Sequence, residues 1–282
     1  MIKNILKGIV IGLANVIPGV SGGTMMVSMG IYDKLIHCVT HLFSEFKKSV
    51  RFLFPIFIGI AAAVVIVPFG IEYLFASYPF QANLLFIGLI LGGLPAVGKK
   101  VRGKSVKPGH IIAGLFFFAL VAGLALLGEK EGAAAAELSL SPGSMIRLFG
   151  VGILASATMV IPGVSGSMML LLIGYYHPVL AVITDFIKAL LAFDLNGILW
   201  GIGVLTPFGI GVVIGIFAIA RLVEIIFESF PLYAYWAIIG LILSSPVAIL
   251  IVGGMGSITV VSVLTGAAAL AVGFAAALKL GE

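Results

Sequence analysis

The sequence predicts an all-α, polytopic membrane protein built from two inverted repeats, each with a re-entrant hairpin and about three transmembrane helices. Composition, an internal repeat and the distribution of basic residues support this fold class. Of the 282 residues, 61% are hydrophobic and only 10% are charged, whereas a soluble domain carries about 25% charged residues. Uncharged runs such as 52–70 approach the roughly 20 residues that a spanning helix needs. Because a soluble fold cannot cover this much apolar surface, lipid is the expected solvent.

An internal repeat divides the chain. The segment Ile-Pro-Gly-Val-Ser-Gly at 17–22 recurs at 161–166, an offset of 144 residues. Further along, an offset of 152 residues aligns Glu72 with Glu224, and 87–91 with 239–243. A duplication explains both matches. The first repeat is predicted at 1–128 with its motif loop at 17–24, the linker at 129–144, and the second repeat at 145–282 with its motif loop at 161–168.

Each repeat is expected to begin with a broken apolar segment that carries the motif. An amphipathic stretch and three apolar spans follow it. Long apolar runs between polar loops mark these spans. In chain order, we expect the spans at about residues 52–77, 81–98, 110–128, 198–230, 233–252 and 257–279.

The basic residues distinguish motif segments that cross the membrane from segments that dip in and return. If they are re-entrant and the N-terminus is cytoplasmic, 13 of the 16 Lys and Arg residues lie inside. If each motif segment crosses once, the better orientation places 10 inside and 6 outside. The positive-inside rule therefore favours re-entrant segments. Since three spans per repeat is an odd number, the second repeat is inverted. We expect a multi-pass protein of the cytoplasmic membrane with both termini in the cytoplasm.

The motif is expected to break a helix and to bind an anion. Proline removes a backbone donor and glycine permits positive φ. New half-helices would begin after the break, and their N–H groups and hydroxyls favour an anion. Gly and Ser kinks that allow close helix packing are the alternative. The predicted break points are Pro18, Gly19, Pro162 and Gly163, and the predicted phosphate-headgroup binders are Ser21, Gly22, Gly23, Thr24, Ser165, Gly166 and Ser167.

Three ionisable residues fall inside apolar segments, where such groups are functional candidates. Arg221 is the predicted side-chain cation for the phosphate, because a guanidinium can fork a phosphate. A local pair with Glu224, three residues on along the same helical face, is the alternative. Glu72 and its repeat equivalent Glu224 are candidates for coupling transport to H⁺ or Na⁺. Two interfacial carboxylates would give the same pattern.

No metal, cofactor or catalytic site is predicted. His37 and His41 are spaced i, i+4 in an amphipathic stretch, a pattern more typical of an interfacial helix than of a metal site. The segment 98–105 matches the phosphate-binding pattern G-x-x-x-x-G-K-S, but it joins two membrane spans instead of a strand and a helix. The net charge of +5 lies in short loops, so membrane topology explains it better than nucleic acid binding does.

The two motif regions resemble those of a known family. The segments GLANVIPGVSGGTMMVSMGIYDKLI and ATMVIPGVSGSMMLLLIGYYHPVL are similar to the paired motifs of the PopT-type polyprenyl-phosphate translocases, and the resemblance covers nearly the whole chain. It implies a transporter that returns undecaprenyl phosphate from the outer to the cytoplasmic leaflet, by alternating access around paired phosphate-binding loops. The second copy has Ser167 and Met168 where the first has Gly23 and Thr24. The two loops are therefore expected to bind unequally.

Two rival functions stay open at this point. A membrane lipid phosphatase would also bind phosphate in lipid, but it needs a nucleophile or an acid–base histidine beside basic residues or a metal. No such cluster is evident in the sequence. A small-anion transporter or ion channel could use the same inverted loops. The expected partners are the polyprenyl-phosphate lipid and membrane lipids, with homo-oligomer formation left open.

Overall fold

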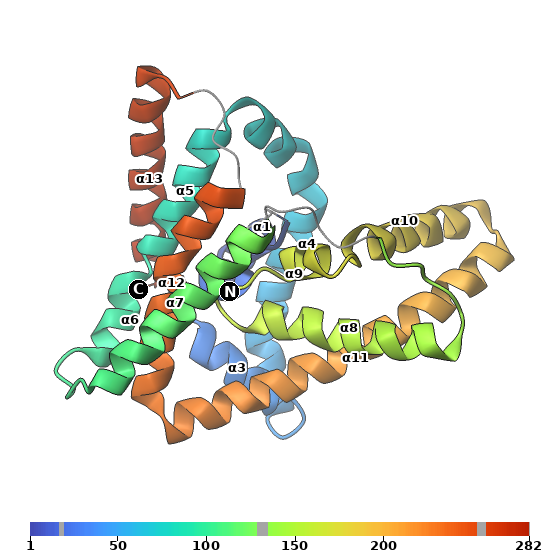
Figure 1. The fold of residues 1–282 in the computed structure, drawn as a ribbon, viewed down its shortest axis with the longest axis horizontal. Helices are drawn as coiled ribbons and strands as arrows, with labels where there is room; N and C mark the ends of the chain where they lie inside the picture. Colours follow the sequence, from blue (N-terminus) through green and yellow to red (C-terminus); the bar gives the residue numbers. More distant parts are fainter. Residues whose placement is uncertain (17–19, 129–134, 253–257, 282) are drawn as a thin grey trace.

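The computed structural model describes residues 1–16, 20–128, 135–252 and 258–281, and in these ranges every regular element is an α-helix (Figure 1). The predicted all-α class is confirmed. In Figure 1, α5 and α13 lie on one side of the molecule and α8, α10 and α11 extend to the other. In chain order the helices are α1 (Ile2–Val16), α2 (Gly22–Ser28), α3 (Tyr32–Thr40), α4 (Phe46–Ser77), α5 (Pro79–Leu91), α6 (Leu94–Val101), α7 (Pro108–Gly128), α8 (Pro142–Val160), α9 (Gly166–Leu172), α10 (Tyr176–Ala192), α11 (Leu195–Ser229), α12 (Pro231–Val252) and α13 (Val260–Gly281).

Among the described residues, six helical segments are long and apolar enough to cross a membrane. A seventh span results if α9 and α10, which meet at an angle of 110°, are counted together. The six segments are α7, α8, α11, α12, α13, and α5 taken together with α6. The predicted first span at 52–77 lies within α4, a helix of 32 residues. The prediction of a polytopic membrane protein is confirmed.

Local sequence signals set the start of α8 and of α11 in the second repeat. Ser141 Oγ accepts a hydrogen bond from Ser144 N–H at 3.3 Å, and Pro142 occupies the first position of α8. Asp194 Oδ1 accepts from Asn196 N–H at 3.1 Å at the start of α11. Both side chains satisfy backbone donors that a helix leaves unpaired in its first turn.

The helices pair in a pattern that repeats. α1 packs along α4, and α8 packs along α11 in the same way. The last helix of each repeat packs on the other repeat, α13 on α5 and α7 on α12 (Figure 1). Glycines allow equivalent close contacts, since a Cβ on Gly59 would lie 2.1 Å from Ile5 O, and one on Gly211 would lie 2.1 Å from Phe149 O. The exchange of last helices joins the two repeats into one intertwined fold.

The second repeat is inverted relative to the first. A Cβ on Gly109 at the start of α7 would lie 2.7 Å from the Tyr233 hydroxyl at the start of α12, so both helices start at one end of the bundle. α11 ends where α12 starts. In the first repeat, two spans separate the start of α4 from the start of α7, namely α4 itself and α5 together with α6. Two crossings return the chain to the same end, so α4 and α7 start at one end of the bundle. α4 therefore begins at the end of the bundle where α11 finishes. This arrangement agrees with the inversion that the charge distribution predicts.

Each motif segment forms a hairpin whose exit lies beside its entrance. In the first hairpin, Lys7 Nζ in α1 donates to Met29 O after α2 at 2.8 Å. In the second, Ala136 N–H ahead of α8 donates to Gly174 O after α9 at 3.0 Å. α1 has 15 residues, or about 22 Å of helix, which is shorter than the roughly 30 Å hydrocarbon core. These features agree with re-entrant hairpins.

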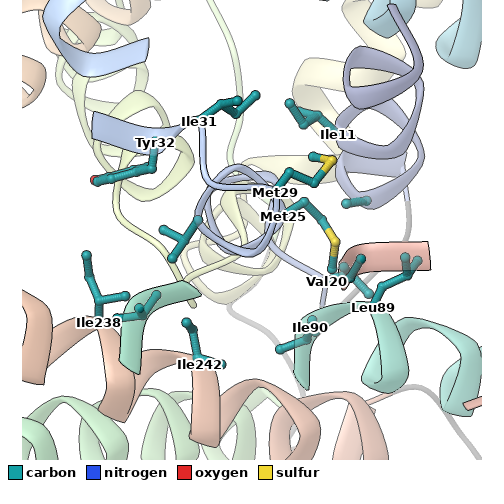
Figure 2. Packing of buried hydrophobic residues seen from close by; sticks show 14 of the residues in the cluster. Ile11, Val20, Met25, Met29, Ile31, Tyr32, Leu89, Ile90, Ile238 and Ile242 are labelled. Atoms are coloured by element: carbon teal, nitrogen blue, oxygen red, sulfur yellow. The ribbon is translucent and has the colours of Figure 1, made fainter. Parts of the chain in front are cut away.

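The largest hydrophobic core surrounds α2 (Figure 2). Met25 and Met29 are each 1% exposed. Figure 2 shows them between Ile11 of α1, Ile90 of α5 and Ile242 of α12. None of the residues of α9, the equivalent helix of the second repeat, is buried. The two motif helices therefore have unequal surroundings.

Candidate functional site

The two motifs meet inside the protein. Gly163 N–H of the second motif donates to Thr24 Oγ1 of the first at 2.7 Å, in a buried hydrogen bond. Tyr32 OH donates to the carbonyl oxygen of Val160, the last residue of α8, at 3.0 Å. α8 therefore ends against the first repeat, although its length alone would let it cross a membrane.

A small cavity lies between the two motifs. Its volume of about 20 Å³ is room for about one water molecule. A phosphate group is larger than this space. The cavity is lined by both motif loops and by the ends of the helices before them, namely Asn15, Val20, Ser21, Gly22, Met159, Val164, Ser165, Gly166 and Ser167.

The serine hydroxyls of this cavity differ in their partners. Ser21 is 3% exposed, and its Oγ has no hydrogen-bond partner within the described part of the chain. Ser165 Oγ and Ser167 Oγ hydrogen bond to each other at 2.9 Å. Neither Ser21 nor Ser165 caps its own helix with its side chain. A buried hydroxyl without a partner costs about 1–3 kcal/mol, so the Ser21 hydroxyl calls for a functional explanation.

The predicted headgroup binders divide into two groups. Ser21, Gly22 and the segment 165–167 line the cavity. Thr24 instead bonds to Gly163, and a Cβ on Gly23 would lie 3.1 Å from the Cα of Pro162. Thr24 therefore links the two motifs, and Gly23 allows them to approach closely.

The predicted break of the helix is present in the second motif. The chain is non-helical between the end of α8 and the start of α9. Gly163 has φ +84° in this break, a backbone conformation that residues other than glycine rarely adopt. Pro18 and Gly19 lie outside the described residues.

Four lining residues were not predicted as binders, namely Asn15, Val20, Met159 and Val164. Asn15 and Met159 come from the helix ends that precede the motifs. A Cβ on Gly22 would lie 2.3 Å from Asn15 Oδ1, so a glycine at this position keeps the amide beside the cavity. An asparagine within an otherwise apolar segment is the sequence signal that could have identified this residue.

Arg221 does not line the cavity between the motifs. Its Nη1 lies 2.6 Å from Glu224 Oε2, and its side chain is 55% exposed. The local pair that the sequence left open is therefore present. The headgroup role of Arg221 stays a prediction.

The coupling role of the two glutamates also stays a prediction. The side chain of Glu72 lies outside the described residues. Glu224 is 8% exposed at its side chain and accepts a hydrogen bond from Thr40 Oγ1 at 2.9 Å. Its Oε1 also lies within 3.4 Å of His37 Nδ1.

Comparison with known proteins places the chain in a family. Residues 11–265 match the family model described as undecaprenyl phosphate translocase-like. A polyprenyl-phosphate transporter of Staphylococcus aureus is 30% identical over 248 residues, which cover 87% of this chain and 85% of the relative. A polyprenyl-phosphate transporter of Vibrio cholerae is 31% identical over 212 residues, which cover 70% of this chain and 65% of the relative. No solved structure matches the chain significantly.

The matched region contains both motifs, the first hairpin from residue 11 on, the second hairpin and the cavity between the motifs. The family resemblance carried by the motifs is thereby confirmed. This chain belongs to the undecaprenyl phosphate translocase-like family.

Proposed function

We propose that this protein transports a polyprenyl phosphate, and that it returns undecaprenyl phosphate from the outer to the cytoplasmic leaflet. The names of the curated relatives and of the family support the substrate class. The observation that carries the proposal is the buried hydroxyl of Ser21, which lines the cavity between two inverted motifs and lacks a partner among the described residues. Such a hydroxyl can donate to an anionic headgroup.

The headgroup binds between the motif loops. Ser21 donates from the first motif, and the pair formed by Ser165 and Ser167 keeps one hydroxyl hydrogen that can donate from the second. The Asn15 amide adds a further donor at the cavity wall. Hydrogen bonds to an ionised acceptor are about twice as strong as neutral ones. Because α2 and α9 have only 7 residues each, the hydroxyls contribute more to binding than the helix dipoles do.

Movement of the hairpins provides alternating access. The contact between Thr24 and Gly163 closes the cavity in the present arrangement. Since each hairpin enters and leaves on its own side, withdrawal of one hairpin opens the cavity to that side only. The apolar tail stays in lipid beside exposed hydrophobic side chains of α7 and α13, such as Leu115, Phe116 and Leu264.

A larger cavity beside α2 provides a cytoplasmic exit for the headgroup. Its volume is about 280 Å³, and Lys99, Lys100, Asp33 and Tyr235 line it. Lys100 Nζ lies 3.6 Å from Asp33 Oδ2, an exposed pair that contributes little stability and can exchange partners. Two lysines at this end agree with a cytoplasmic location of both termini in the cytoplasmic membrane.

The test is the thermal stability of the purified protein with three ligands: undecaprenyl phosphate, the same polyprenol without phosphate, and inorganic phosphate. A ligand at about 100 times its Kd stabilises a protein by about 2.7 kcal/mol, which raises the melting temperature by about 5–10 °C for a chain of this size. We expect this shift only with undecaprenyl phosphate. An equal shift with inorganic phosphate would support the rival small-anion transporter, and no shift with any phosphate would contradict the proposal.

A further inference from the structure

The structure brings together three potential metal ligands that are far apart in the sequence. His37 and His41 lie on α3 of the first repeat, and Glu224 lies on α11 of the second. One ligand atom from each of them lies within 4.8 Å of the other two. The sequence alone favours an interfacial helix for the two histidines. The carboxylate that completes the cluster comes from the other repeat.

The two distances from Glu224 to the histidines fit a metal site. Glu224 Oε1 lies 3.4 Å from His37 Nδ1 and 3.3 Å from His41 Nδ1. A direct N–H···O hydrogen bond is shorter, at about 2.7–3.2 Å. A tetrahedral zinc ion with bonds of about 2.0–2.1 Å holds its ligand atoms about 3.3 Å apart. We propose that His37, His41 and Glu224 form a Zn²⁺ site that bridges the two repeats.

The groups around the cluster orient its ligands. Arg221 Nη1 bonds to Oε2 of Glu224 at 2.6 Å, which leaves Oε1 for the metal. Thr40 Oγ1 donates to the same Oε1 at 2.9 Å and lies 3.0 Å from His41 Nδ1, so Zn²⁺ takes the place of this hydroxyl between the ligands. The positive charge of Arg221 disfavours a cation here, and the carboxylates of Asp33 and Glu228, which line the adjacent cavity with Glu224, offset it.

Glu45 lies on the other side of the His37 ring. Its Oε2 lies 3.8 Å from His37 Nε2, the ring nitrogen that does not face Glu224. Metal-bound histidines usually give this second N–H to a carboxylate, which makes the other nitrogen a better ligand. The same Oε2 lies 2.7 Å from Lys48 Nζ, and a carboxylate oxygen can accept more than one hydrogen bond.

An acidic cavity gives the ion access to the site. Its volume is about 260 Å³, and Asp33, Glu224 and Glu228 line it together with His37. The side chains of His37 and His41 are 44% and 35% exposed. Two nitrogen ligands and one carboxylate, with a fourth position open to water, suit Zn²⁺. Mg²⁺ and Ca²⁺ prefer all-oxygen sites.

Metal binding would tie the two repeats together. α3 and α11 are in contact in this arrangement, and a ligand that binds only this arrangement stabilises it. The test measures metal binding alone, so its outcome does not depend on the transported substrate. The full-length protein is purified without a histidine tag, treated with a chelator and titrated with ZnCl₂.

We expect one Zn²⁺ per chain and a melting temperature raised by about 5 °C or more at saturation. Co²⁺ in place of Zn²⁺ should give the visible absorption bands of a tetrahedral complex. Loss of a hydrogen-bond partner of a metal ligand costs about 10–100-fold in metal affinity. Loss of a ligand should cost more, so we expect a larger decrease in Zn²⁺ affinity for His37→Ala, His41→Ala and Glu224→Gln. Glu45→Gln should decrease the affinity by about tenfold. His177→Ala, on the exposed face of α10, is the matched control and should bind as the unmodified protein does.

Two outcomes would overturn the proposal. One is an unmodified protein with neither a Zn²⁺-dependent shift nor tetrahedral Co²⁺ bands. The other is unchanged Zn²⁺ affinity in all three ligand variants. Because the Co²⁺ spectrum is recorded on the unmodified chain, it decides the matter even if a variant folds poorly.

Discussion

The double variant Ser21→Ala, Ser165→Ala is expected to lose polyprenyl-phosphate transport by at least about tenfold while it keeps its fold. Both hydroxyls line the cavity between the motifs and are proposed to donate to the phosphate. One hydrogen bond to a charged group contributes about 1.5–3 kcal/mol, which corresponds to roughly 10–150-fold in affinity. The measurement is surface labelling of undecaprenyl phosphate in cells that lack the protein and regain either form.

Stability is expected to change in the opposite direction. The Ser21 hydroxyl is buried without a partner among the residues described, and such a group costs about 1–3 kcal/mol. Ser21→Ala should therefore leave the melting temperature unchanged or raise it. A purely structural role for Ser21 predicts a lower melting temperature together with lower transport.

Ser49→Ala is the matched control. Ser49 Oγ is also buried and has no partner in the part of the chain that the structure describes. It lies on α4, away from the cavity between the motifs. This variant should show the same stability effect with full transport. Full transport in the double variant would remove the site assignment, and an equal loss in Ser49→Ala would show that the loss is not specific to the cavity.

The second large effect is expected for Gly211→Ala. The added Cβ would lie 2.1 Å from Phe149 O, and a backbone atom cannot swing aside as a side-chain end can. α8 must then move away from α11. Overpacking of this kind costs about 1–3 kcal/mol or more. We expect a lower melting temperature and less folded protein in the membrane, measured by thermal unfolding and by gel filtration of detergent extracts.

Gly209→Ala is the control on the same helix. A Cβ at Gly209 meets nothing within 4 Å, and alanine favours a helix over glycine by up to about 1 kcal/mol. This variant should be neutral or slightly more stable. Gly59→Ala in the first repeat should behave like Gly211→Ala, since its Cβ would lie 2.1 Å from Ile5 O. Equal effects at Gly209 and Gly211 would contradict the described contact of α8 with α11.

Much of the fold follows from the sequence, because the hydrophobic effect and backbone geometry act locally. The predicted spans at 110–128 and 233–252 correspond to α7 and α12, since a long apolar run in lipid must satisfy its own backbone as a helix. The distribution of Lys and Arg predicts the inversion. The exact repeat boundaries at 128 and 145 stay predictions.

The contacts between repeats could not be predicted in the same way. Helix periodicity does not show which face of α7 or α13 meets protein, because every face of a membrane helix is apolar enough to face either lipid or protein. The packing of α7 on α12, and of α13 on α5, depends on complementary glycine positions in two distant segments.

The candidate site shows the same limit. Ser21 and Ser165 were predicted from the motif, yet the bond between Thr24 and Gly163 joins residues more than a hundred positions apart. The approach of Glu224 to His41 is equally distant in sequence. The sequence does not show that α3 packs on α11. The histidines of α3 and the carboxylate of α11 therefore appear in the sequence as two unrelated features.

A structure of the protein bound to undecaprenyl phosphate, determined by cryo-electron microscopy, tests headgroup binding between the motifs most directly. Phosphate density is expected between the two motif loops, within hydrogen-bond distance of Ser21 Oγ and of Ser165 or Ser167 Oγ, with the bond between Thr24 and Gly163 broken. Density only in the cavity beside Lys99 and Lys100, with that bond intact, would contradict it.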